Sequence, residues 1–258
     1  AAAKLFIAHG AKVMLGDIQE EQGQAMAESL GPNAAYRYCN VTAEDDVEGL
    51  VEAAVEQFGR IDIMFNNAGI VGAIGPLELT PAAEWQMTLD ILLNGVFYGM
   101  KHASRHMKKQ GSGSIISMSS VAGVTGGLGP HAYAAAKHAV VGLTRNLAAE
   151  VCTFGVRVNC IAPYSVATPM VADAYLSDHT NIDQTVQMLA DESPLKGRAG
   201  TAEDVANAAL WLASDESGYT SGMTLTVDAG ITTGSVAGAP RFADYRPIMR
   251  EAGKAGLD

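Results

Sequence analysis

The chain alternates short apolar runs rich in β-branched residues with longer segments of helical periodicity, and this order constrains the fold most strongly. Runs that are apolar throughout are typical of strands buried on both faces of a sheet. Where such strands alternate with helices, the strands pair in parallel and the helices cover both faces. The sequence therefore predicts an α/β fold, with a doubly wound parallel sheet.

The expected elements form one domain over residues 1–240, followed by a tail at residues 241–258. The expected strands cover residues 12–17, 34–41, 61–66, 114–119, 156–161 and 224–228, and the expected helices cover residues 18–30, 44–58, 81–109, 133–154 and 202–213. A further helix is under way at the first residue. Residues 164–197 interrupt the alternation as an apolar insertion. We favour a substrate lid, because long ordered insertions often close over active sites, over a surface excursion that packs its own side chains.

Composition excludes several classes of function. The net charge of −11 argues against nucleic acid, and no apolar run approaches the ~20 residues that span a bilayer. The three cysteines form neither a zinc pattern nor a disulfide framework, which favours a reducing compartment such as the cytoplasm.

His102 and His106 are four residues apart on an expected helix, but no third ligand is evident, so we predict a helix surface rather than a metal site.

Three residues form a candidate catalytic set. Tyr133 and Lys137 lie four residues apart, on one face of an expected helix. Ser120 follows the buried strand upstream, and strand ends in parallel sheets are where such folds place ligands. A nearby ammonium can lower the pKa of a phenol, which suits Tyr133 to proton exchange with a substrate hydroxyl. A serine hydroxyl at the same point can hydrogen-bond the substrate oxygen.

This set resembles the Ser–Tyr–Lys set of the short-chain dehydrogenase/reductase family, which has a Rossmann-type fold. Further segments that match the family are Asn66-Asn67-Ala68-Gly69, Ile161-Ala162-Pro163, Val166-Ala167-Thr168-Pro169, Ser221-Gly222 and Val227-Asp228. The resemblance runs from Ala1 to about Gly230. Tyr164 after Pro163 is similar to plant members of secondary metabolism that act on terpenoid, lignan or abscisic-acid-pathway alcohols.

The resemblance implies an oxidoreductase that transfers hydride between NAD and a small hydrophobic secondary alcohol or ketone. Tyr133 is then the general acid/base, Lys137 tunes it and holds the nicotinamide ribose, and Ser120 polarises the substrate oxygen. The implied cofactor-binding residues are Asp17, Asn40, Val41, Asn67, Ala68, Gly69, Tyr133, Lys137, Pro163, Val166 and Thr168. The resemblance also implies a homotetramer or dimer, formed through the helices at residues 84–107 and 133–154.

Asp17 predicts which nicotinamide cofactor is used. It ends an expected strand, where a carboxylate can accept hydrogen bonds from the adenosine ribose hydroxyls and repel a 2′-phosphate. No arginine or lysine adjoins it in the sequence, which favours NAD over NADP. The alternative is an acid that caps the helix after the strand.

The chain departs from the family in its first residues. Members open with a strand and a TGxxxGxG loop, whereas residues 1–10 resemble the helix that follows this loop. The absent strand is central in the family, so we expect the strands on either side of the gap to lack backbone partners, and the chain to be part of a longer protein. Residues 233–240 approach the loop pattern, but they follow the last strand and are not interpreted as a phosphate site.

A second departure is Leu92, three residues before Gly95, where the family usually has an asparagine that holds a water of its proton relay. Asn94 lies on another side of the helix and should not replace it. The sequence therefore predicts a weakened relay. The departures leave open a truncated, catalytically inactive remnant that acts as a binding or interaction module. An NADP-linked ketone reductase is a further alternative, which Asp17 disfavours.

Overall fold

The computed structural model describes residues 1–234, so the expected tail at 241–258 and most of residues 233–240 lie outside the described residues. The α-helices are α1 (Ala2–Ala8), α2 (Glu20–Leu30), α3 (Glu44–Phe58), α4 (Ala82–Leu89), α5 (Gly95–Gln110), α6 (His131–Val151), α7 (Pro169–Leu176), α8 (Ile182–Glu192) and α9 (Ala202–Ala213). The strands are β1 (Val13–Asp17), β2 (Ala34–Tyr38), β3 (Ile63–Asn66), β4 (Gly113–Met118), β5 (Val156–Pro163), β6 (Val166–Ala167), β7 (Gly200–Thr201) and β8 (Thr224–Val227). Within this described range, no helix is both long and apolar enough to cross a membrane.

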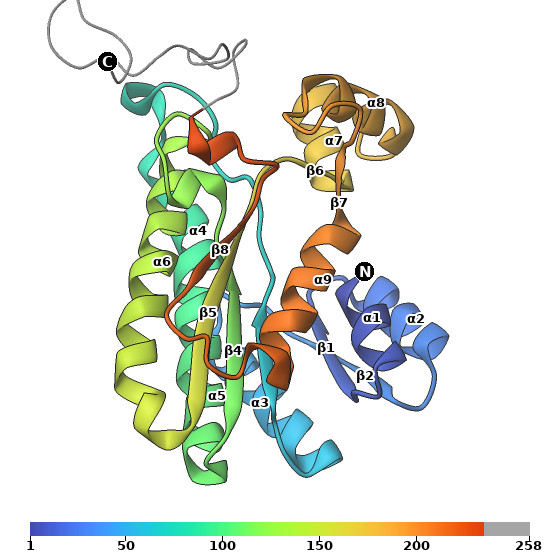
Figure 1. The fold of residues 1–258 in the computed structure, drawn as a ribbon, viewed down its shortest axis with the longest axis vertical. Helices are drawn as coiled ribbons and strands as arrows, with labels where there is room; N and C mark the ends of the chain where they lie inside the picture. Colours follow the sequence, from blue (N-terminus) through green and yellow to red (C-terminus); the bar gives the residue numbers. More distant parts are fainter. Residues whose placement is uncertain (235–258) are drawn as a thin grey trace, which may run out of the picture.

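The main sheet has the order β3-β4-β5-β8, and all its strands are parallel. Neighbouring side chains on a strand point to opposite faces, so Ile115 packs into one core and Ile116 into another. Helices α5 and α6 supply the first core, and α1 and α9 supply the second, as their places on the two faces of the sheet indicate (Figure 1). This arrangement confirms the expected doubly wound α/β fold.

Strands β1 and β2 form a separate parallel ribbon beside the main sheet (Figure 1). Among residues 1–234, no strand pairing joins β1 to β3. The first three residues of β1 and of β3 are apolar and only half-buried, as expected for strands that each lack a neighbour on one side. The strand edges expected to be unpaired are thus present, and packing of α1 on α9 and of α3 on α5 holds the ribbon to the main sheet.

The helix expected at residues 81–109 is present as helical backbone from Ala82 to Gln110, with one irregular turn. A π-helical turn at Asp90–Asn94 separates α4 from α5, and π-turns inside helices occur frequently at functional sites. Leu92 lies in this turn and is fully buried. The angle between Leu92 and Asn94 therefore differs from that of an ideal α-helix. The amide of Asn94 donates to Asp90 Oδ1 at 2.8 Å, which commits it to its own turn.

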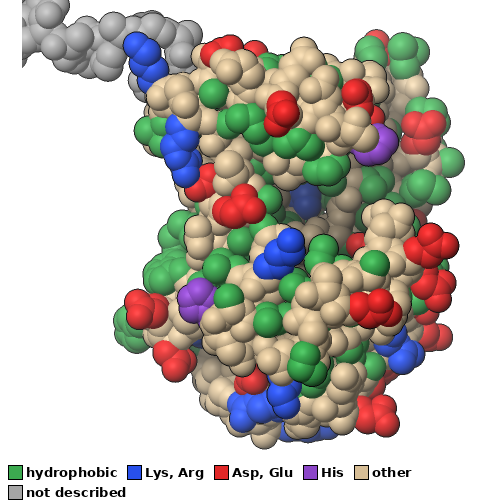
Figure 2. Space-filling view, turned by 90° about the vertical axis from the view of Figure 1, so that its right-hand side faces the viewer, with side chains coloured by type: hydrophobic (Ala, Val, Ile, Leu, Met, Phe, Trp, Pro, Cys, Tyr) green, Lys and Arg blue, Asp and Glu red, His purple; other side chains and the backbone are tan. Residues whose placement is uncertain are grey.

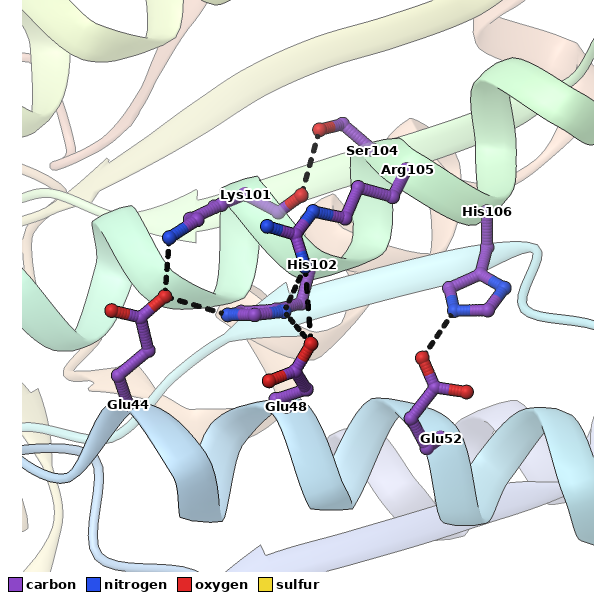
Figure 3. A network of polar contacts seen from close by, with 8 residues as sticks. All are labelled: Glu44, Glu48, Glu52, Lys101, His102, Ser104, Arg105 and His106. Carbon is purple, nitrogen blue, oxygen red and sulfur yellow. Dashed lines mark hydrogen bonds and ion pairs between the residues drawn. The ribbon is translucent and has the colours of Figure 1, made fainter.

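Ion pairs join the first turns of α3 to the middle of α5 (Figure 3). His102 is buried, with Nε2 at 3.0 Å from Glu44 and Nδ1 at 3.3 Å from Glu48. One turn further along α5, His106 Nε2 lies 2.8 Å from Glu52. The two histidines therefore face glutamates of a neighbouring helix, and the predicted helix surface is wrong for His102, because α3 covers this face of α5. Among the residues that the structure describes, no cluster could hold a metal ion.

Replacing His102 with leucine should lower the free energy of unfolding by about 2 kcal/mol. The reason is that the buried imidazole contacts the carboxylates of both Glu44 and Glu48, and leucine removes both contacts. The matched control is His106→Leu, whose exposed glutamate partner should make the loss about 0.5 kcal/mol or less. Urea unfolding of both variants measures the difference. Equal losses would contradict a special role for His102 in joining the two helices.

Residues 164–201 form a projection above the main sheet (Figure 1). Its stem is the parallel pair β6 and β7, and α7 and α8 pack against each other above it. Ala172, Thr185 and Leu189 are buried and form its small interior. The insertion thus contains two helices that pack their own side chains, while its closing over a substrate stays a prediction.

Candidate active site

Ser120 lies just beyond the carboxyl end of β4, in extended backbone with φ −165°. Its hydroxyl oxygen accepts a hydrogen bond from Ala122 N at 3.1 Å and so caps the short helical turn Val121–Gly123. This contact fixes the direction of the side chain. The serine hydroxyl is thereby held in one orientation at the end of a buried strand.

The turn after Ser120 packs directly against α6. A Cβ atom on Gly123 would lie 2.4 Å from Ser119 Oγ and 2.6 Å from Lys137 O, so only glycine permits this approach. Ser119 Oγ donates to the same Lys137 carbonyl at 2.9 Å. The end of β4 is therefore attached to the turn of α6 that carries Lys137. The sequence interpretation missed Ser119 and Gly123, although small residues directly after a candidate serine are a usable signal of close packing.

Tyr133 and Lys137 stand one turn apart near the start of α6, as their spacing predicts. The ammonium of Lys137 lies 5.4 Å from the centroid of the Tyr133 ring, within the range of a cation–π contact. Lys137 is 4% exposed, and its Nζ donates to Met118 O at 2.7 Å, on the strand that leads to Ser120. The structure thus brings together the three residues predicted as the catalytic set.

Burial shapes the protonation of this set. It raises the pKa of the Tyr133 phenol, while the nearby Ser120 side chain lowers that pKa in part. Burial also lowers the pKa of the Lys137 ammonium from 10.5 to about 8. At neutral pH the pair is therefore a neutral phenol beside a cation, and the cation favours any negative charge that develops on the phenol oxygen. The arrangement suits reversible proton transfer at Tyr133.

The predicted cofactor-binding residues follow the carboxyl ends of successive strands. Asp17 ends β1, Asn40 and Val41 follow β2, Asn67, Ala68 and Gly69 follow β3, and Pro163, Val166 and Thr168 lie at or after the end of β5. Because all these strands are parallel, the residues share one edge of the fold. The side of the molecule that carries α1 and α2 is deeply hollowed across its middle (Figure 2). Ligands of parallel sheets bind at the carboxyl ends of the strands, and these residues lie there.

The residues predicted for the adenosine end lie on the β1–β2 ribbon. The Asp17 side chain is exposed, and its Oδ1 accepts from Gln19 N at 2.9 Å. Asn40 Oδ1 accepts two hydrogen bonds from Thr42, so this oxygen is engaged in the turn that leads into α3. Val41 packs against Gly95 of α5, where an added Cβ would come within 2.9 Å. No hydrogen bond or ion pair among residues 1–234 joins these groups to Tyr133 or Lys137 directly.

Leu92 packs beneath the segment that follows β3. A Cβ built on Gly69 would lie 3.2 Å from Leu92 Cδ2, so the leucine occupies the space below the Asn67–Gly69 turn. The position expected to hold a relay asparagine is therefore apolar and filled. The loss of that relay stays a prediction.

Comparison with known proteins adds to this geometry. The family model described as enoyl-(acyl carrier protein) reductase matches residues 1–232. A (+)-borneol dehydrogenase from Salvia officinalis is 49% identical, over 89% of this chain and 83% of its own length. A xanthoxin dehydrogenase from Arabidopsis thaliana is 44% identical, over 89% of this chain and 84% of its own length. Both relatives are named as dehydrogenases.

A solved structure shares the fold. Levodione reductase superposes with a TM-score of 0.82 at 36% sequence identity, over 90% of this chain and 92% of that chain. The match therefore includes the elements that carry Ser120, Tyr133 and Lys137, since these lie in the middle of the chain.

Proposed function

The chain belongs to the short-chain dehydrogenase/reductase family, a family of oxidoreductases, and we propose that it transfers hydride between NAD and a small hydrophobic secondary alcohol or ketone. The observation that carries the proposal is the cluster of Ser120, Tyr133 and Lys137 at the end of β4. Relatives named for borneol and xanthoxin support a terpenoid-type alcohol as the substrate.

Each residue of the cluster has one task in this proposal. Tyr133 exchanges the proton of the substrate hydroxyl, and the Ser120 hydroxyl hydrogen-bonds the same oxygen as its charge changes. Lys137 is an ammonium below about pH 8 and stabilises the phenolate form of Tyr133. The bound nicotinamide supplies or accepts the hydride.

The described residues offer groups for both ends of a dinucleotide. The exposed carboxylate of Asp17 at the end of β1 fits ribose hydroxyls, and the nearby Val41 fits an adenine ring. Lys137 and Asn67 would hold the second ribose, and Pro163, Val166 and Thr168 would line the nicotinamide. We assign Asn40, Ala68 and Gly69 to the same site because they lie at the same edge of the fold.

Turnover tests the proposal directly. We expect the purified protein to reduce NAD in the presence of borneol or a monocyclic secondary terpene alcohol, followed by the absorbance of the reduced nicotinamide. A primary alcohol of the same size is the control, and it should react at least about tenfold more slowly. Binding of NAD without turnover of any secondary alcohol would contradict the proposed activity and favour a binding module.

Cofactor choice gives a separate prediction. The wild-type protein should bind NAD at least about tenfold more tightly than NADP, because the Asp17 carboxylate accepts ribose hydrogen bonds and repels a 2′-phosphate. Asp17→Ala should reduce this ratio to about threefold or less. Glu20→Gln, which removes a charge from the first turn of α2, is the control and should keep the ratio. Equal affinities of the wild type, measured by calorimetry, would refute the assignment.

We also propose that copies of the chain associate through α5 and α6. Phe97 on α5 and Phe154, in the short turn that follows α6, are each more than two-fifths exposed, at 43% and 44%. Burial of such aromatic side chains favours association between copies.

A further inference from the structure

A cavity of about 330 Å³ opens at the carboxyl ends of β5 and β8, beneath α8. Its walls include Tyr164, Leu189, Glu192, Arg198, Val227 and Asp228. A cavity of about 150 Å³ is enough to hold benzene, so this one has room for a skeleton of two rings. None of the three residues of the candidate catalytic set lines it.

The cavity nevertheless begins next to the candidate active site. In the pairing of β4 with β5, Met118 lies beside Ile161, and Ser119 N donates to Ile161 O at 2.8 Å, so Ser120 follows directly after the end of this pairing, as Pro163 does on β5. Tyr164 follows, and its backbone amide donates to Val227 O at 3.1 Å. Neighbouring strands are about 4.8 Å apart, which places the cavity wall at Tyr164 one strand from Ser120. A substrate whose reacting oxygen lies at Ser120 can therefore extend past Tyr164 into the cavity.

Most of the charges around the cavity are satisfied within the protein. Arg198 Nη2 lies 2.5 Å from Asp204 Oδ1, so this pair is internally neutral. The oxygens of Asp228 accept hydrogen bonds from Gly230 N, Thr232 N and Thr232 Oγ1. Arg198, Asp204 and Asp228 therefore line the cavity with their charges already paired or hydrogen-bonded within the protein.

Glu192 differs from these residues. It is the last residue of α8, where the helix dipole disfavours a negative charge, and the last turn of α8 holds no basic residue. Within residues 1–234, its carboxylate has no hydrogen bond or ion pair, whereas the adjacent Asp191 accepts from Gln187 at 2.9 Å. Burial raises the pKa of the Tyr164 phenol, and Tyr175 and Glu192 raise it further, which agrees with their closeness. Glu192 is therefore an exposed carboxylate in the lining of the cavity, with its oxygens available to accept a hydrogen bond from a ligand there.

We propose that the cavity binds the far end of the substrate, and that Glu192 accepts a hydrogen bond there from a second hydroxyl group. Glu192 is then a specificity-determining residue that selects diols and hydroxyketones over simple alcohols. The inference rests on the proposed function, since it concerns the same substrate. An anionic group at the far end is disfavoured, because two carboxylates would meet.

The test compares cyclohexanols that carry a second cyclohexyl ring, whose far end is hydrogen, hydroxyl or carboxylate. We expect the wild type to use the diol with a kcat/KM at least about tenfold above that of the mono-alcohol, since a hydrogen bond to a charged group contributes about 1.5–3 kcal/mol. This exceeds the factor of about two that arises from two reactive hydroxyls. The carboxylate should be the poorest substrate.

Glu192→Gln should reduce the preference for the diol to about threefold or less, and Asp191→Asn, the matched control on α8, should keep it. A preference that Glu192→Gln leaves intact, or a wild type without any preference, would overturn the inference while leaving the proposed function standing. Absence of turnover for all three compounds in a protein that binds NAD would overturn the proposed function and, with it, this inference.

Discussion

Replacing Tyr133 with phenylalanine is expected to lower kcat by about 10²–10⁴-fold, because the variant keeps the ring but loses the group that exchanges the substrate proton. The ring packs beside Lys137, 5.4 Å from its ammonium to the ring centroid, and phenylalanine preserves this contact. Phenylalanine fills the same half-buried space, so the variant should fold normally and bind NAD with an affinity within about threefold of wild type. Steady-state kinetics and calorimetry measure the two quantities.

Tyr98→Phe is the matched control, since it removes a hydroxyl from α5 that is not in the candidate site. It should leave kcat within about twofold of wild type. Retention of more than about a tenth of wild-type turnover by Tyr133→Phe would refute the role of Tyr133 as general acid/base.

Replacing Lys137 with methionine is expected to lower kcat by at least about 100-fold and yet stabilise the protein at pH 7. Burial lowers the pKa of Lys137 from 10.5 to about 8. The difference of about 2.5 units corresponds to roughly 3 kcal/mol by which the folded state disfavours the ammonium at neutral pH. Methionine removes this cost and loses the hydrogen bond to Met118 O, worth about 1 kcal/mol. The net gain in the free energy of unfolding is about 1–2 kcal/mol.

The gain in the free energy of unfolding from Lys137→Met should decrease as the pH rises. Between the folded pKa of about 8 and the unfolded pKa of 10.5, the unfolded wild type binds more protons than the folded one, so its stability rises with pH in this window. The advantage of Lys137→Met is therefore largest below pH 8 and vanishes towards pH 10.5. Lys109→Met, at an exposed position of α5, is the control and should show neither effect. Destabilisation by Lys137→Met at pH 7 in urea unfolding would contradict the account.

The order of the elements and the catalytic set could be predicted from sequence because both depend on local patterns. The helices at Glu44–Phe58 and Ala202–Ala213 have the expected bounds. β2 ends at Tyr38, before the expected residue 41, because the Asn40 side chain forms a turn with Thr42. The set of Ser120, Tyr133 and Lys137 could be predicted because a helical spacing of four residues and the end of an apolar strand can both be recognised in the sequence.

Features that depend on contacts between distant residues could not be predicted in the same way. The π-turn at Asp90–Asn94 differs from an α-helix by one residue in a turn, and its apolar pattern is compatible with both. The two-residue strands β6 and β7 are too short to leave a periodic signal. Glu192 reaches the cavity only because residues 164–201 fold back over the ends of β5 and β8.

Transfer of isotope from substrate to cofactor tests the central claim most directly. A secondary alcohol of the proposed class, with deuterium on its carbinol carbon, is incubated with the purified protein and NAD, and the nicotinamide is examined by NMR. We expect deuterium on the reduced nicotinamide in an amount equal to the ketone formed, and transfer at least about 100-fold slower with Tyr133→Phe. Ketone without deuterated nicotinamide, or transfer by Tyr133→Phe at more than about a tenth of the wild-type rate, would contradict the proposed activity.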